Sequence, residues 1–99
     1  MNGKERANLR AEAQRLSPLV HVGHAGVTDA IVKTMDDVLR THELVKADIS
    51  RNLDAPIKQL AGALAEATGS EVVQVIGRKA TFYRENPELE RKGSVPPWR

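Results

Sequence analysis

The chain has 99 residues, of which 40 % are hydrophobic, and its formal net charge at pH 7 is +2. This length gives one domain with a modest core and leaves no room for a separate substrate domain. No apolar stretch approaches the ~20 residues that span a bilayer, no signal-peptide segment is found, and the lack of cysteine excludes disulfides and thiolate metal sites. We therefore expect a cytoplasmic protein with no membrane partner.

The charge is unevenly distributed along the chain. Residues 1–27 carry a net charge of +2, residues 28–76 carry −3, and residues 77–99 carry +3. If the basic ends meet in the fold, they create a one-sided positive field that suits a polyanion such as a nucleic acid. Charge alone leaves open a mildly basic domain with no such partner.

Seven elements are predicted, in the order helix, strand, helix, strand, helix, strand, strand. Their approximate ranges are 4–16, 19–22, 28–42, 44–49, 54–68, 72–76 and 80–84. The helices are indicated by apolar residues at helical spacing, such as Leu9, Ala13 and Leu16 in the first. Thr28 is a good N-cap for the second helix, and Gly69 stands where a left-handed cap would end the third.

The strands are indicated by period-two patterns. Residues 44–49 alternate apolar and charged side chains, which predicts a strand with one buried face. Residues 72–76 are apolar on both faces apart from Gln74, which predicts a central strand. Residues 80–84 close a hairpin with that strand.

Helical crossovers join the first three strands, so these strands should run parallel. The predicted fold class is an α/β two-layer (α+β) sandwich with a four-stranded mixed sheet. The second and third helices should share one face, and the first helix should cover part of the other. We expect residues 1–84 to form the domain, and residues 85–99, which are polar and contain prolines, to form a largely unpacked tail.

The most informative segment is the turn Gly23-His24-Ala25-Gly26, which joins a strand to the start of a helix. Glycines let the backbone approach a phosphate closely, and amides near a helix start can donate to an anion. His24 at the tip could add a hydrogen bond or a stack. The segment lacks the Gly-Lys-Ser/Thr ending of a P-loop and the third glycine of a dinucleotide site. Taken alone, it also fits a plain turn.

Three blocks resemble the signature of the CRM domain (chloroplast RNA splicing and ribosome maturation), especially its stand-alone bacterial form, the YhbY-like RNA-binding proteins. The blocks are Val22–Thr28, His42–Lys46, and Val75–Lys79 continuing into Phe82–Arg84. They occur in the family's order and spacing, and the resemblance covers roughly residues 4–84.

The resemblance implies a four-stranded mixed sheet with stacked helices, similar to the C-terminal domain of bacterial translation initiation factor three. It also implies RNA contact through the Gly23–Gly26 turn and association with precursors of the large ribosomal subunit. Two positions depart from the family pattern. Ala25 stands where relatives often carry a polar residue, and Asp48 stands where many carry a basic one.

We therefore predict an RNA-binding protein for ribosome biogenesis, acting as a monomer on structured ribosomal RNA. Three basic residues within seven positions, Arg78, Lys79 and Arg84, rank above those of the first helix. The predicted RNA-binding residues are Gly23, His24, Ala25, Gly26, Thr28, Lys46, Arg78, Lys79, Arg84, Arg10 and Arg15. The alternative is a protein-interaction module that docks on a ribosomal protein or an assembly enzyme.

Other functions find little support in the sequence. Three aromatic residues are few for a reader of splayed bases, although Tyr83 could be exposed. His21 and His24 have no further ligand at a suitable spacing, so we expect no metal and no cofactor. Asp36-Asp37 reads as a solvated helix face with no nucleophile tied to it, so we expect no enzyme.

Overall fold

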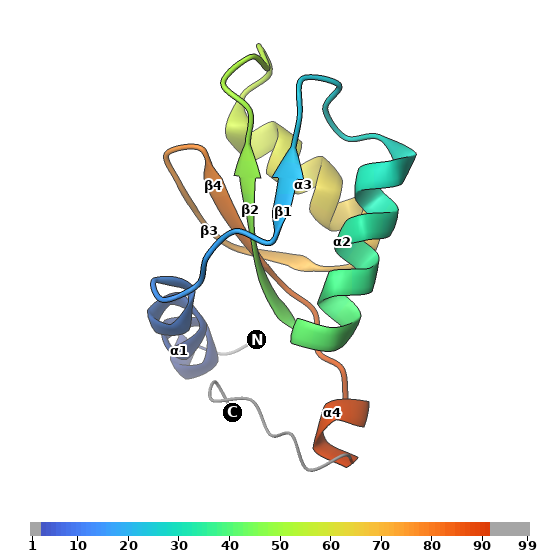
Figure 1. Ribbon diagram of the computed structural model, residues 1–99. Helices are drawn as coiled ribbons and strands as arrows, with labels where there is room; N and C mark the ends of the chain where they lie inside the picture. The colour runs from blue at the N-terminus through green and yellow to red at the C-terminus, as the bar shows by residue number, and fades with distance from the viewer. Residues whose placement is uncertain (1–2, 92–99) are drawn as a thin grey trace.

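The computed structural model describes residues 3–91 (Figure 1). Its elements, in chain order, are α1 (Gly3–Ala13), β1 (Val20–Val22), α2 (Asp29–His42), β2 (Leu44–Ile49), α3 (Ile57–Thr68), β3 (Glu71–Ile76), β4 (Lys79–Tyr83) and α4 (Glu88–Arg91). The order of the first seven elements confirms the sequence prediction. The first helix is shorter than predicted, because the chain leaves it after Ala13 and continues in a turn.

The four strands form one mixed sheet in the order β1-β2-β4-β3. β1 pairs with β2 in parallel, whereas β4 is antiparallel to both of its neighbours, β2 and β3. β1, β2 and β3 therefore run in one direction, as their helical crossovers require.

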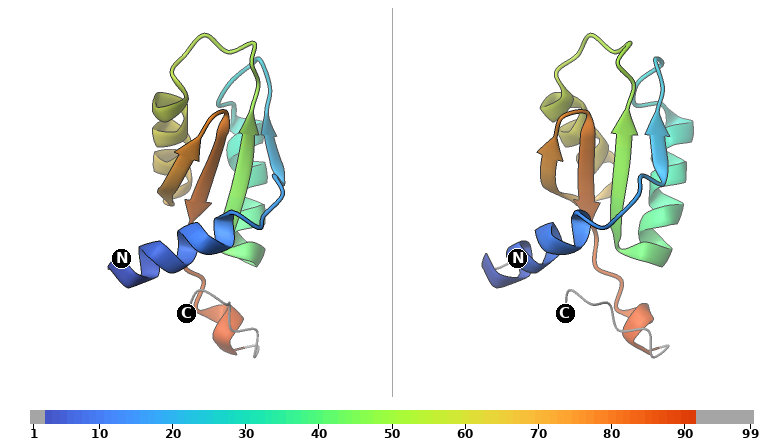
Figure 2. Two further views of the ribbon diagram at one scale, coloured as in Figure 1. Left: turned by 90° about the vertical axis from the view of Figure 1, so that its left-hand side faces the viewer. Right: turned by 60° about the vertical axis from the view of Figure 1, so that its left-hand side comes forward.

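Helices α2 and α3 cover one face of the sheet, and α1 crosses part of the other face (Figures 1 and 2). The main core lies under α2 and α3, where Met35 and Leu39 from α2 and Leu64 from α3 pack against Val45 and Phe82 of the two central strands. A smaller cluster lies under α1, where Leu9 packs against the opposite sheet face. This arrangement confirms the predicted fold class.

The prediction that residues 72–76 form a central strand is wrong, because β3 lies at an edge of the sheet. Its apolar side chains are explained by cover on both faces. Val72 and Val75 join the main core, and Val73 is buried with Leu9 of α1. A strand that is covered by helices on both faces has apolar side chains on both faces, even when it pairs with only one other strand.

The segment after β4 is attached to the domain, so the expectation of an unpacked tail is wrong for its first residues. Glu43, the C-cap of α2, is fully buried and has a positive φ of 61°. Its carboxylate accepts a hydrogen bond from the Asn86 amide at 2.6 Å, and the Asn86 side chain donates to the Arg40 carbonyl at 2.5 Å. Helix α4 follows, and the rest of the predicted tail, residues 92–99, lies outside the described residues.

None of the helices within residues 3–91 is both long enough and apolar enough to cross a bilayer.

An ion pair joins β4 to α2. Arg84 follows β4, and its Nη1 atom lies 2.5 Å from Oδ1 of Asp36. The same guanidinium donates to the carbonyls of Asp36 (3.0 Å) and Thr68 (2.8 Å), so it links α2, α3 and β4. The hydrogen bond from Arg84 lowers the pKa of Asp36 below its ordinary value of 3.8, and the positive charges of Arg84 and Arg40 lower it further against the opposing effect of partial burial.

We expect Asp36→Asn to lower the free energy of unfolding at pH 7 by about 1 kcal/mol, a modest value because both side chains are partly exposed. Because the pKa of Asp36 is lower in the folded protein than in the unfolded chain, its ionised form stabilises the fold at pH values above the unfolded-state pKa. This stabilisation is lost as the pH falls through the folded-state pKa. The difference between parent and variant should therefore shrink below about pH 4. Urea unfolding at pH 7 and pH 3 measures it. Asp37→Asn, which removes a more exposed carboxylate, is the control and should show a smaller effect; equal effects of the two variants would contradict the assignment.

Candidate nucleic-acid interface

Three connections gather at one end of the sheet. Because β1, β2 and β3 point the same way, the segments that follow them meet at their carboxyl ends. We call this the loop end: the turn 23–26, the loop 50–56 and the hairpin turn 77–78. Figure 1 shows these connections together above the strands.

The turn after β1 is tight and has an exposed tip. The Gly26 amide donates to the Gly23 carbonyl at 2.9 Å, which closes the turn. Gly23, His24 and Ala25 are exposed. Within residues 3–91, the amides of His24 and Ala25 donate no hydrogen bond. The tip therefore offers two amide donors to an anion, whereas the Gly26 amide is already used.

Helix α2 begins directly after this turn, as predicted. The Thr28 side chain accepts a hydrogen bond from the Ile31 amide at 3.2 Å, so it caps the helix. Asp29 in the first turn already complements the positive end of the helix dipole. This carboxylate disfavours an anion at the helix start itself and leaves the tip, at His24 and Ala25, as the better place for one.

The turn rests on the loop that follows β2. Gly26 is buried with φ of +76°, and a side chain at this position would lie 3.7 Å from Cδ2 of Leu53. The Ser50 amide donates to the Val22 carbonyl at 2.9 Å, immediately before the turn. The two loops are thus fixed against each other by packing and by a hydrogen bond.

Arg78 from the hairpin turn completes this connection. Its Nε atom donates to the Ile49 carbonyl at 3.0 Å, and its Nη2 atom donates to the Ser50 carbonyl. A guanidinium has five N–H donors, so three remain for other partners. Arg78 is half-buried at the loop end, and its hydrogen bonds hold the start of the loop of residues 50–56 in place.

Arg51, which was not among the predicted residues, also lies at the loop end. This side chain is exposed on the loop directly after Ser50, and within residues 3–91 it makes no ion pair. The signal was available, because the carboxyl ends of parallel strands share one edge and Arg51 follows such a strand as closely as Gly23 does.

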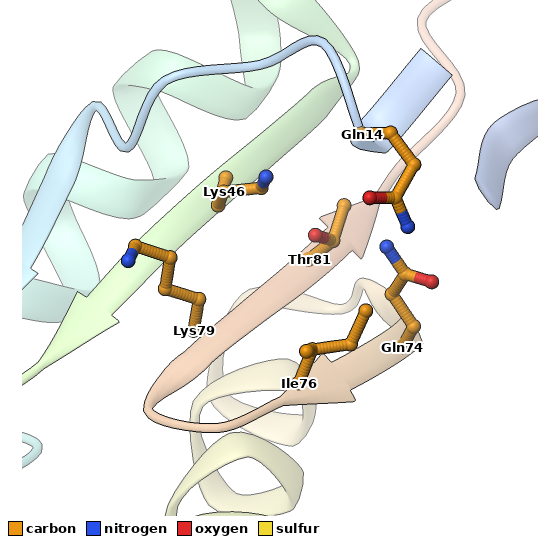
Figure 3. A pocket seen from close by; sticks show the side chains of 6 residues that line it. All are labelled: Gln14, Lys46, Gln74, Ile76, Lys79 and Thr81. Carbon is orange, nitrogen blue, oxygen red and sulfur yellow. The ribbon is translucent and has the colours of Figure 1, made fainter. Parts of the chain in front are cut away.

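Lys46 and Lys79 lie on the sheet face opposite α2 and α3. They line a shallow hollow with Gln14, Gln74, Ile76 and Thr81 (Figure 3). Asp48 lies on the same face, across from Lys79 in the strand pairing, and its Oδ2 atom is 3.8 Å from Nδ1 of His21. The two lysines therefore extend the positive surface away from the loop end, beside one carboxylate.

The structure does not bring the remaining predicted residues to the loop end. Arg84 lies past the far end of β4 and is held by Asp36. Arg10 is exposed on α1. Arg15 follows α1, and its Nη1 atom lies 3.8 Å from Oε1 of Glu12. Helix α1 packs where β2 begins and β4 ends, away from the loop end. Three basic side chains are thus separated from the turn by the length of the sheet.

The aromatic side chains add no stacking platform at the loop end. Phe82 is fully buried in the main core, and Tyr83 packs beside Leu9 on the opposite face of the sheet. Trp98 lies outside the described residues. Within residues 3–91, no three His, Asp or Glu side chains gather in a way that could hold a metal ion.

Comparison with known families matches residues 1–84 to the CRS1 / YhbY (CRM) domain. The chain belongs to this family. The CRM match spans the turn, the hairpin and the three sequence blocks that suggested the resemblance.

Individual CRM relatives cover most of the chain. The "Probable RNA-binding protein YqeI" of Bacillus subtilis is 33 % identical over 88 residues, which are 89 % of this chain and 92 % of the relative. A Haemophilus influenzae protein named "RNA-binding protein" is 31 % identical over 97 % of this chain and 95 % of its own. The solution structure of the hypothetical protein SAV1595 from Staphylococcus aureus has a TM-score of 0.75 and 38 % identity, and covers 87 % of this chain and 90 % of that one.

The two glycines of the turn should differ in their effect on stability. Gly26→Ala should lower the free energy of unfolding by about 1–2 kcal/mol, because a side chain disfavours the positive φ. Gly23→Ala should leave it unchanged or slightly higher, since no atom lies near the added methyl group. Urea denaturation measures both. A loss at Gly23 as large as that at Gly26 would show that the turn has a different conformation.

Proposed function

We propose that this protein binds structured RNA, and that the RNA is ribosomal RNA of the large subunit or its precursor particle. The observation that carries the proposal is the exposed tip of the turn, where two backbone amides donate no hydrogen bond within residues 3–91, at the same end of the sheet as Arg51 and Arg78. The names of the relatives, which describe RNA-binding proteins, support the same partner. The ribosomal target rests on the family resemblance.

The proposed contact is with the sugar-phosphate backbone. Amide donors suit phosphate oxygens, and the absence of side chains at Gly23 lets RNA come close. Arg51 adds an exposed positive charge, and Arg78 offers the donors that Ile49 and Ser50 do not use. His24 and Thr28 flank this group, and Thr28 acts by capping α2. Lys79 and Lys46 continue the contact along the sheet.

The RNA-binding unit in this proposal is residues 1–84, acting as a cytoplasmic monomer without catalysis. Arg84 stabilises the domain through Asp36 and is left out of the contact set. Arg10 and Arg15 could reach only RNA that extends beyond the sheet toward α1.

An acidic residue at the tip tests the contact. Ala25→Asp should weaken binding of a large-subunit rRNA hairpin about tenfold or more, because a carboxylate beside the amide donors repels phosphate. Ala63→Asp, on the exposed side of α3, introduces the same charge away from the loop end and should change the affinity little. Fluorescence anisotropy at about 50 mM salt measures both. If the two variants behave alike, the tip is not the site.

Removal of Arg51 should reduce the salt dependence of binding. If Arg51 neutralises one phosphate, Arg51→Ala should lower the magnitude of the slope of log affinity against log salt concentration by about one. Titrations of the same hairpin between about 50 and 200 mM salt give the slope. A parent that binds no rRNA at about 50 mM salt would overturn the proposal and favour docking on a protein.

A further inference from the structure

The sheet face opposite α2 and α3 is only partly covered. Helix α1 crosses the end where β2 begins and β4 ends, and leaves the rest of the face open, as the right-hand view in Figure 2 shows. A hollow of about 170 Å³ lies on the open part. Its lining comes from four elements or their ends: Gln14 after α1, Lys46 on β2, Gln74 and Ile76 on β3, and Lys79 and Thr81 on β4.

A hydroxyl group lies in the lining of the hollow. Thr81 is only 1 % exposed and lines the hollow, and within residues 3–91 no fully buried side-chain nitrogen or oxygen lacks a hydrogen-bond partner. Figure 3 shows the carboxamides of Gln14 and Gln74 facing each other, with Thr81 beside them. The Thr81 hydroxyl opens onto the hollow, where a bound group can replace water as its hydrogen-bond partner.

An irregularity in β3 gives the hollow its second carboxamide. The pairing of β3 with β4 shifts between Val72 and Gln74, because Val72 pairs with Phe82 and Gln74 pairs with Thr81. The extra residue, Val73, is buried under α1. Bulges re-aim side chains in this way, and here the result is that Gln74 faces the hollow directly after Val73 rather than the main core.

The chemistry of the lining fits one unpaired nucleotide of the bound RNA. Two carboxamides and a hydroxyl supply both donors and acceptors for the edge of a base. Ile76, which is 55 % exposed, offers an apolar wall for the face of the ring. Lys46 and Lys79 make no ion pair within residues 3–91, so both are available to the phosphate.

A bare anion fits the hollow less well than a nucleotide. Asp48 lies across from Lys79 on the same face, and its carboxylate repels a second negative charge there. A neutral base brings no second negative charge, and a ring N–H or exocyclic amine on its edge can donate to this carboxylate. Lys79 also follows directly on Arg78, and Thr81 is only about 10 Å from Arg78 at the rise of a strand. One RNA segment can therefore contact the loop end and the hollow together.

We propose that this hollow binds a single unpaired base, such as one in a bulge, of the RNA whose backbone is held at the loop end. The inference rests on the proposed function and adds a base contact to it. The loop end then supplies affinity without regard to sequence, and the hollow supplies a preference for RNA with an extruded nucleotide.

Two hairpins that differ only by one bulged uridine provide the test. The parent should bind the bulged hairpin about tenfold more tightly than the fully paired one. Thr81→Val keeps the shape of the side chain and removes the hydroxyl, and Gln74→Leu removes one carboxamide. Each should reduce the preference about threefold to tenfold while the affinity for the fully paired hairpin stays the same. Gln59→Leu, on the exposed side of α3, is the matched control and should keep the full preference.

A second measurement locates the base directly. Addition of uridine 5′-monophosphate should shift the side-chain amide resonances of Gln14 and Gln74 in the parent and should shift them less in Thr81→Val. Shifts confined to residues 23–25 and Arg51 would overturn the inference.

The possible failures are distinguishable. Equal affinity of the parent for the two hairpins, or a preference that survives both substitutions, overturns the hollow as a base site while the backbone contact stands. Binding of neither hairpin overturns the proposed function and this inference together.

Discussion

The candidate interface depends on the hydrogen bonds that join three chain segments at the loop end. The Ser50 amide donates a hydrogen bond to the Val22 carbonyl, and the Arg78 guanidinium donates to the carbonyls of Ile49 and Ser50. These bonds fix the turn of residues 23–26 relative to the following loop and the hairpin. A backbone contact to RNA needs donors in a set geometry, since flexible donors lose conformational entropy on binding. The arginine that charge patterning suggested for phosphate is thus also the residue that shapes the site.

Much of the fold could be predicted because its signals are local. The alternation over residues 44–49, the Thr28 cap and the left-handed Gly69 all stand in the structure where the sequence placed them. The position of β3 at the edge could not be predicted. Apolar residues on both faces show that both faces of a strand are covered, but they do not show how many strands lie beside it. Cover by α1 is a long-range contact that no local pattern records.

The candidate site was predicted only in part for a similar reason. Arg78 and Arg84 are close in sequence, but an extended strand separates residues six apart by about 20 Å. Their closeness in the sequence therefore suggested one cluster, although the sheet places the two side chains at opposite ends. The same geometry concealed Arg51, which is distant in sequence from both the turn and the hairpin yet follows a strand that ends beside them. Pairing of the strands, rather than spacing along the chain, decides which charges act together.

The irregular pairing in β3 has a consequence for how the molecule meets others of its kind. β3 is an edge strand, and a regular exposed edge is a template on which a strand of another chain can add. A bulge increases the local twist and disturbs the even succession of backbone groups that such addition requires. The same extra residue that turns Gln74 toward the open face thus makes this edge a poor starting point for self-association, which matters for a basic protein that would be concentrated along a long polyanion.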